Sequence, residues 1–234
     1  MSDGPRVLHH DAHVLVMHKP SGLAVHPGWV PRTERTAMHW ARREAKQHVY
    51  PVHRLDRATS GVLVFALSSE VARTLGQHFS GGTVQKRYVA LVRGTPDEHG
   101  QIDHPVPKSE GGERVPAQTD YRRLRRSDAD RCSLVEARPK TGRLHQIRRH
   151  LKHLSHPLVG DVRYGKGDIN RRYRTTWGLH RLALHALQLS MPHPRWDGTL
   201  DVWAPVPADL AEPLERLGLL SAVPEQPDAQ APNI

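Results

Sequence analysis

Alternating and continuous apolar runs along the chain mark the strands that we expect. Apolar and polar residues alternate through residues 7–18, as in a strand with one buried face. Residues 62–67 form a nearly continuous apolar run, which is typical of a strand buried on both faces. Five further segments have the composition of strands: residues 84–93, 118–126, 132–138, 185–190 and 199–204.

Helical spacing of apolar residues, with capping signals at the ends, predicts helices between these strands. The helices we expect cover residues 36–47, a segment from Ser68 or Ser69 to Gly81, residues 144–154 and residues 207–217. The first of them lacks helix breakers. The second has a serine to cap its first turn and two glycines that end it.

Gly, Pro and polar residues gather in the segments between these elements. We expect loops over residues 20–31 and 94–116, the second of them mobile, and a disordered tail over residues 223–234. The pattern predicts an α+β fold, a single domain over residues 1–222 built on a largely antiparallel mixed sheet flanked by helices and loops. We find no internal repeat and no dinucleotide-binding fingerprint.

The charge balance favours a polyanionic partner. The 234 residues include 34 Lys and Arg against 24 Asp and Glu, a formal net charge of +10. Such a balance suits nucleic acid, because each neutralised phosphate releases counterions. The one cysteine, Cys132, excludes an intramolecular disulfide and sits in a strand-like run, as a buried structural thiol does. With no apolar signal region or membrane span in the sequence, we expect a cytoplasmic protein.

Residues 53–61 have the sequence His-Arg-Leu-Asp-Arg-Ala-Thr-Ser-Gly. This composition is unsuited to a buried core segment and suits a turn that exposes a carboxylate. Asp56 lies between Arg54 and Arg57, and nearby positive charge favours the ionised form. An ionised, oriented aspartate can serve as a nucleophile or a general base. The alternative for so short a pattern is a surface turn with local ion pairs.

This segment resembles the catalytic motif of the RluA family of RNA pseudouridine synthases. Three other segments match motifs of the same family in the expected order: Lys-Pro-Ser-Gly-Leu-Ala-Val-His-Pro at 19–27, Gln-Lys-Arg-Tyr at 85–88 and Lys-Thr-Gly-Arg-Leu-His-Gln-Ile-Arg at 140–148. The resemblance covers roughly residues 7 to 205. The stretch before the first motif is too short for the small RNA-binding domain that many members carry there.

The resemblance implies an isomerase that converts a uridine of RNA to pseudouridine. The bond between C1′ and N1 breaks, and the base rotates and rejoins the ribose through C5. Since no redox or phosphoryl-transfer step is involved, we expect no cofactor and no metal. Asp56 is the predicted carboxylate. It can add to the ribose, add to the base or abstract a ribose proton, and the sequence does not choose among these routes.

Two further catalytic residues follow from the resemblance. Arg148 is expected to form an ion pair with Asp56; on a helix it lies about 40° from Leu144, at the edge of the apolar face. The alternative is an arginine that only snorkels from an amphipathic helix. Tyr88 is expected to stack on the target base or to carry a proton during release of C5–H. The alternative is a tyrosine packed in the sheet.

Several residues are candidates for binding the substrate. Arg54 is expected to fill the space that a flipped uridine leaves in the RNA, with a plain ion pair to Asp56 as the alternative. Lys86 is a phosphate contact or an ordinary edge-strand charge. Lys19, Arg143 and His145 complete this predicted set.

The sequence leaves the RNA partner open between tRNA, which the resemblance favours, and ribosomal RNA. A non-catalytic RNA-binding module and a base-excising glycosylase are alternatives from other classes. We expect a monomer. His150, His153 and His156 have helical spacing that can bind zinc, but acidic and cysteine ligands are sparse nearby, so no metal site is predicted.

Overall fold

The computed structural model describes residues 4–27, 31 and 35–227. Within these ranges the helices are α1 (Ala37–Ala45), α2 (Ser69–Ser80), α3 (Gln146–His153), α4 (Gly167–Trp177), α5 (Ala208–Arg216) and a 3-10 turn, η2 (Leu220–Ala222). The strands are β1 (Arg6–His10), β2 (Val14–Lys19), β3 (Tyr50–Pro51), β4 (Ser60–Ala66), β5 (Gln85–Arg93), β6 (His99–Asp103), β7 (Val106–Pro107), β8 (Arg114–Val115), β9 (Gln118–Arg126), β10 (Cys132–Pro139), β11 (Leu184–Pro192) and β12 (Thr199–Trp203).

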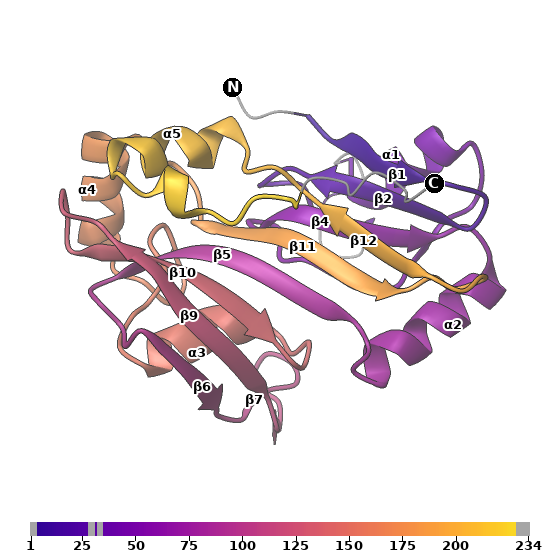
Figure 1. Ribbon diagram of the computed structural model, residues 1–234, viewed down its shortest axis with the longest axis horizontal. Coiled ribbons are helices and arrows are strands. Elements are labelled where there is room, and N and C mark those ends of the chain that lie inside the picture. Colours follow the sequence, from indigo (N-terminus) through magenta and orange to yellow (C-terminus); the bar gives the residue numbers. More distant parts are fainter. Residues whose placement is uncertain (1–3, 28–30, 32–34, 228–234) are drawn as a thin grey trace.

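One large sheet runs through the molecule (Figure 1). Its strand order is β1-β2-β4-β11-β5-β10-β9-β6, with β3 against β4 and β12 against β11. β11 pairs with β4 in parallel, whereas it pairs with β5 and β12 in antiparallel fashion. β7 and β8 form a separate small ribbon. The predicted α+β fold with a largely antiparallel mixed sheet is confirmed.

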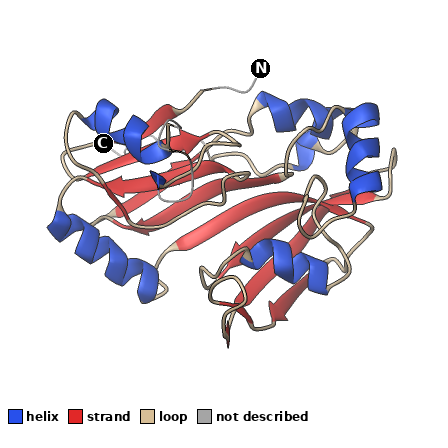
Figure 2. Cartoon of the chain, turned by 180° about the vertical axis from the view of Figure 1, so that it is seen from behind, coloured by secondary structure: helices blue, strands red, loops and turns tan. Residues whose placement is uncertain are grey.

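Helices cover both faces of this sheet, because its central strands are apolar on both sides. In β4, Val62 and Val64 enter the core beneath α2, while Leu63 and Phe65 enter the core beneath α1. α4 and α5 pack on the same face as α2, and α3 packs on the same face as α1. Figure 2 views the molecule from the side of α3, which lies in front of the strands.

Most of the predicted elements are confirmed, including their end signals. The Ser68 hydroxyl accepts the backbone N–H of Val71 and so caps α2, which ends at Gly81. The predicted double burial of the 62–67 strand is also confirmed. Cys132 is buried and free, as expected.

Two sequence interpretations are wrong, and one helix was not predicted. Residues 94–116 are not one loop but contain β6, β7 and β8, because β6 pairs along β9 and buries Ile102. Residues 7–18 form two strands, since the Asp11 carboxylate accepts the N–H groups of His13 and Val14 and turns the chain between them. α4 was not predicted. Val223, at the start of the expected tail, packs against the core, and residues 228–234 lie outside the described residues.

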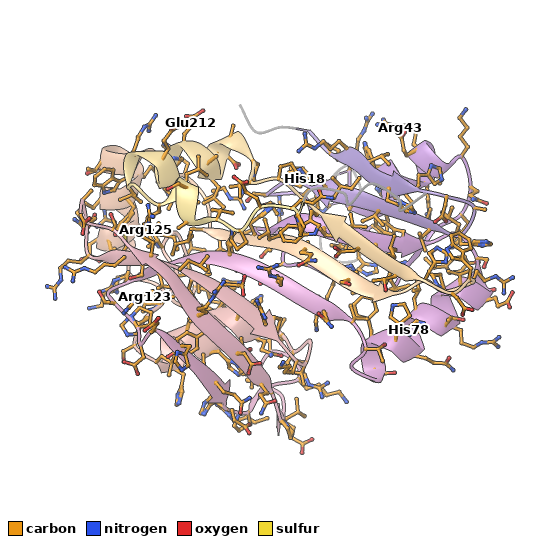
Figure 3. All side chains as sticks on the ribbon, in the orientation of Figure 1. His18, Arg43, His78, Arg123, Arg125 and Glu212 are labelled. Carbon is orange, nitrogen blue, oxygen red and sulfur yellow. The ribbon has the colours of Figure 1, made fainter. Side chains whose placement is uncertain are left out.

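Arginine side chains of β9 tie this strand to the C-terminal segment and to the chain before β6. Arg123 and Arg125 extend from β9 at the left of Figure 3. The Arg125 guanidinium donates to the Ser221 hydroxyl at 3.0 Å, and Arg123 donates to the carbonyl of Pro96. These bonds hold the outer strands, whose inner neighbours β5 and β10 carry part of the site.

Gly61 fixes how the strand after the motif joins the sheet. Its φ is +120°, and a Cβ there would lie 2.1 Å from the carbonyl oxygen of Ala186 in β11. Only glycine permits this backbone conformation and this approach. Close contact of β4 with β11 therefore sets the position of the preceding loop, which carries Asp56.

Candidate active site

A cavity of about 520 Å³ opens on the α3 side of the sheet. Its walls come from the loop before β4 (residues 52–59, termed the Asp56 loop), the end of α2, the start of β5 and the segment 139–148 that leads into α3. Three of the four sequence motifs therefore meet at one cavity, although residues 60–138 lie between the first of these segments and the last.

Asp56 lies in the wall of this cavity, with one carboxylate oxygen bound and one open. The loop turns at this point, where the N–H of Thr59 donates to the Asp56 carbonyl at 3.0 Å. Arg148 Nη1 donates to Asp56 Oδ2 at 3.0 Å. Asp56 Oδ1 has no hydrogen bond with another described residue, and His145 Nε2 lies 3.7 Å from it. The carboxylate is thus oriented yet has an oxygen able to react.

Arg148 is held by a second carboxylate that sequence analysis missed. Arg148 Nε and Nη2 donate to the two oxygens of Asp161 at 2.8 and 2.9 Å. Asp161 also accepts the backbone N–H groups of Arg163 and Tyr164, each at 2.9 Å. This bidentate arrangement fixes the plane of the guanidinium and points its remaining nitrogen at Asp56.

Both members of this buried pair stay ionised. Burial alone lowers the pKa of Arg148, but the hydrogen bonds and charges of Asp161 and Asp56 raise it above its ordinary value. Burial raises the pKa of Asp161, yet the bonds from Arg148 and from the backbone hold it below its ordinary value. The Arg148 cation therefore lies between two carboxylates, those of Asp56 and Asp161.

His145 adopts a strained backbone beside Asp56. Its φ of 52° is in the left-handed region, which non-glycine residues seldom adopt and which costs roughly 1–3 kcal/mol. Its Nδ1 shares a hydrogen bond of 2.9 Å with the Tyr164 hydroxyl, which leaves Nε2 facing Asp56. Burial lowers the pKa of His145, against the opposing effect of the Asp56 charge.

Gln146 connects the segment 140–146 to the sheet. Its side-chain oxygen accepts the Thr141 hydroxyl at 2.6 Å and the N–H of Arg143 at 3.0 Å. Its amide nitrogen donates to the carbonyl of Gln118 and to the Thr119 hydroxyl, both at 2.9 Å. This buried glutamine therefore joins the segment before α3 to β9.

Tyr88 and Lys86 project into the cavity from β5, two residues apart and so on one face of the strand. Burial and the Asp56 charge raise the pKa of Tyr88, so its phenol stays protonated. Burial lowers the pKa of Lys86 to about 8, and its ammonium donates to the Thr141 carbonyl at 3.1 Å. Tyr88 packs partly against the cores under both α1 and α3, which places it between them.

Of the remaining predicted residues, Arg54 and Arg143 line the cavity with exposed side chains. Lys19 does not line it. The Lys19 ammonium is buried and donates to the carbonyls of Pro20, Leu23 and Arg57 at 2.9, 2.8 and 3.1 Å. The expectation of substrate contact is therefore corrected: Lys19 links its own motif to the Asp56 loop from beneath.

The histidines of α3 have other partners than a metal. His150 is buried and shares hydrogen bonds with the Thr119 hydroxyl and the His104 carbonyl, both of 2.9 Å. His153 stacks on His104, with 3.8 Å between ring centroids. Among the described residues no group of three or more His, Cys, Asp or Glu side chains is placed to hold a metal ion. Within the ranges that the structure describes, no helix is long and apolar enough to cross a membrane.

Sequence comparison assigns the family. The family model described as RNA pseudouridylate synthase matches residues 13–153, which include Asp56 and Arg148. The chain belongs to this family. It is 43% identical over 208 residues to tRNA pseudouridine synthase C of Pasteurella multocida, covering 80% of this chain and 86% of the relative. It is 41% identical over 208 residues to the protein of the same name from Haemophilus ducreyi, covering 81% and 86%.

Solved structures agree with this assignment. Human RNA Pseudouridylate Synthase Domain Containing 4 superposes with a TM-score of 0.73 at 28% identity, covering 91% of this chain and 92% of the human one. Human RNA Pseudouridylate Synthase Domain Containing 1 gives 0.70 at 28% identity, covering 87% and 84%. The protein is an RNA pseudouridine synthase, an isomerase, as the motifs led us to expect.

Proposed function

We propose that this isomerase converts a uridine of tRNA to pseudouridine and that Asp56 is its reacting carboxylate. The observation that carries the proposal is the Asp56–Arg148 ion pair in the wall of the 520 Å³ cavity. A cavity of this size holds a nucleoside. The relatives that share about four-tenths of its residues are named for tRNA, which supports tRNA over ribosomal RNA.

In this proposal Arg148 orients Asp56 through Oδ2 and leaves Oδ1 to react. The same oxygen serves for addition to the ribose, for addition to the base and for abstraction of a ribose proton. Because the guanidinium charge is shared with Asp161, Asp56 is held without being fully neutralised.

The cavity residues hold the base while it is detached. Tyr88 stacks on it and relays the proton that leaves C5: the phenol oxygen accepts that proton while its own O–H proton passes to the Asp56 carboxylate. Lys86, Arg143 and His145 offer donors to its carbonyl oxygens or to the backbone phosphates. Arg54, exposed at the mouth, takes the space that the flipped uridine leaves in the RNA stack.

The test is a map of pseudouridines in tRNA and ribosomal RNA, by carbodiimide labelling and primer-extension stops. Cells lacking the protein are complemented with wild type, with Asp56→Asn, or with Asp168→Asn as an exposed acidic control. We expect one missing tRNA site, restored by wild type and Asp168→Asn but not by Asp56→Asn. Purified Asp56→Asn retains RNA affinity within about 3-fold, because only a reacting group changes.

Other outcomes are decisive. A missing ribosomal site refutes the tRNA substrate and keeps the role of Asp56. Turnover by Asp56→Asn refutes that role, and release of free uracil indicates a glycosylase instead. The expected monomer and cytoplasmic location stay predictions, checked by light scattering of the purified protein and by cell fractionation.

A further inference from the structure

Tyr164 lies outside the four sequence motifs but contacts a residue that faces Asp56. The Tyr164 hydroxyl and Nδ1 of His145 share a hydrogen bond of 2.9 Å, and the two rings meet edge to face. The other ring nitrogen of His145, Nε2, lies 3.7 Å from Oδ1 of Asp56. The Tyr164 hydroxyl forms no hydrogen bond with any other described residue, so it serves this one nitrogen.

We propose that Tyr164 is a positioning residue, whose O–H donates to Nδ1 of His145 and so holds the imidazole with its Nε2–H group facing Oδ1 of Asp56. This inference rests on the proposed function, because it concerns the carboxylate oxygen that reacts there. Tyr164 does not line the cavity, so it acts on the reaction only through His145. The Nε2–H group is then the donor that His145 presents beside the reacting oxygen.

Electrostatics decides in which direction the hydrogen bond between Tyr164 and His145 runs. A neutral imidazole carries one proton, and the nitrogen that lacks it can only accept. If Nδ1 held the proton, the lone pair of Nε2 would face the Asp56 carboxylate and be repelled by it. With the proton on Nε2, the N–H faces Oδ1, and Nδ1 accepts the Tyr164 O–H. At 3.7 Å the N–H attracts Oδ1 without engaging it in a hydrogen bond, so this oxygen stays free to react.

The surroundings of His145 keep its imidazole neutral, so the position of its one proton matters. Burial lowers the pKa of His145, and three neighbouring guanidinium groups lower it too, against the opposing effect of the Asp56 charge. Two of these groups, those of Arg148 and Arg149, lie 5.0 and 5.2 Å from the centroid of the Tyr164 ring, where cations are attracted to the aromatic face. The same arginines therefore disfavour an imidazolium and hold the tyrosine ring in place.

Asp161 places Tyr164 as it places Arg148. It accepts the backbone N–H of Tyr164 at 2.9 Å, while its two oxygens accept from the Arg148 guanidinium. One buried carboxylate therefore supports two routes to Asp56. Arg148 reaches Oδ2 directly, and Tyr164 sets the donor that faces Oδ1 by way of His145.

The backbone of His145 also indicates a role for its ring. His145 is the N-cap residue of α3, but its side chain makes no capping hydrogen bond. Its φ of 52° lies in the left-handed region, which non-glycine residues seldom adopt outside functional sites. A histidine that neither caps the helix nor suits this backbone is accounted for by the contacts of its two ring nitrogens.

The first test compares Tyr164→Phe with Tyr50→Phe in full-length proteins, on the tRNA that wild type modifies. Phenylalanine keeps the ring and removes only the hydroxyl. Tyr50 is a half-buried tyrosine whose ring also meets a histidine edge to face, His48, but it does not line the cavity. We expect Tyr164→Phe to lower kcat about 5- to 20-fold with KM within about 2-fold, and Tyr50→Phe to change each by less than about 2-fold.

The ring nitrogens of His145 give a second readout, which needs no RNA. In protein labelled with ¹⁵N at histidine, protonated and unprotonated ring nitrogens differ in chemical shift, and His145→Asn identifies the signals of His145. Asparagine is chosen because it tolerates the left-handed backbone. We expect the proton on Nε2 in wild type and a mixture of tautomers in Tyr164→Phe. A proton on Nδ1 in wild type, or an unchanged tautomer in Tyr164→Phe, would overturn the proposal.

The double variant shows whether Tyr164 acts through His145. Adding Tyr164→Phe to His145→Asn should lower kcat by less than about 2-fold further, because the donor beside Oδ1 is already lost. A full additive loss, or equal kcat for Tyr164→Phe and Tyr50→Phe, would refute the positioning role. A raised KM with unchanged kcat would refute it as well and would indicate that Tyr164 contacts the RNA.

Failure of the proposed function looks different. Wild type would then form no pseudouridine in tRNA, whereas the tautomer of His145 is still measured in the protein without RNA. If wild type modifies ribosomal RNA instead, the same variants are compared on that RNA, where equal kcat for Tyr164→Phe and Tyr50→Phe again refutes the role of Tyr164.

Discussion

Replacing Asp161 by asparagine should both destabilise the protein and slow the reaction. The Asp161 side chain is fully buried and that of Arg148 is 8% exposed, so the two are a buried pair. Removing one partner of such a pair costs about 3–5 kcal/mol. Asparagine keeps the shape and one acceptor oxygen, so we expect a loss of about 2–4 kcal/mol in unfolding free energy.

The effect on the reaction follows from the same geometry. With a neutral amide at position 161, the whole charge of Arg148 falls on Asp56, and the guanidinium loses one of the two bonds that set its plane. We expect kcat to fall about 10- to 100-fold with KM nearly unchanged, because Asp161 touches no substrate. Asp168→Asn, an exposed change in the first turn of α4, should cost less than about 1 kcal/mol and leave kcat unaltered.

Urea unfolding and single-turnover assays on Asp161→Asn, Arg148→Met and the double variant measure both effects. The double-mutant cycle should give a coupling of about 2 kcal/mol or more between positions 148 and 161. A loss below about 1 kcal/mol, a coupling near zero or an unchanged kcat would refute the view that Asp161 positions Arg148.

Further predictions concern the sheet, acid stability and the phenol. Gly61→Ala should reduce unfolding free energy by more than about 3 kcal/mol in urea titrations, because the site has neither the φ nor the space for a methyl group; a loss under 1 kcal/mol would contradict this. Burial lowers the pKa of both His53 and His185 to about 3. The free energy of unfolding that each neutral histidine contributes is therefore complete above pH 6.5 and is lost as the pH falls towards 3, by about 2 kcal/mol per histidine at pH 5. His185→Asn should flatten the measured pH dependence and exposed His99→Asn should not; equal profiles refute the assignment. Tyr88→Phe should bind RNA within about 3-fold of wild type but turn over at least 10-fold more slowly; full turnover would show that the hydroxyl is dispensable and that Tyr88 acts by stacking alone.

Local patterns sufficed for the elements whose burial is regular. The strand at 62–67 and the helix after Ser68 combine strong periodicity with clear end signals, and both are confirmed. The sequence did not predict β6, because this strand lies at the sheet edge and buries little besides Ile102, so that its sequence resembles a polar loop. The sequence does contain a signal for α4, because the apolar residues Ile169, Tyr173 and Trp177 recur every four residues and pack on one core. This apolar pattern was overlooked because arginines occupy many of the positions between them.

For the site, sequence motifs identified groups but not the bonds between them. The ion pair of Arg148 with Asp56 was predicted and is observed. Lys19 was misassigned because a motif lysine in a basic protein suggests RNA contact, whereas three carbonyls take up its donors. Tyr164 escaped notice although cations surround its ring, with Arg148 5.0 Å and Arg149 5.2 Å from the centroid. Such clusters arise from tertiary packing, which no local pattern encodes.

Asp161 shows most clearly why the second carboxylate matters. Were Arg148 bonded to Asp56 alone, all three of its nitrogens would compete for that carboxylate, and both oxygens would be engaged. Asp161 instead takes Nε and Nη2, so that Nη1 reaches only Oδ2 of Asp56. Oδ1 is thereby left without a hydrogen bond to a described residue, in the wall of the cavity. A buried acid that bonds Arg148 rather than Asp56 thus determines which oxygen of Asp56 is free to react.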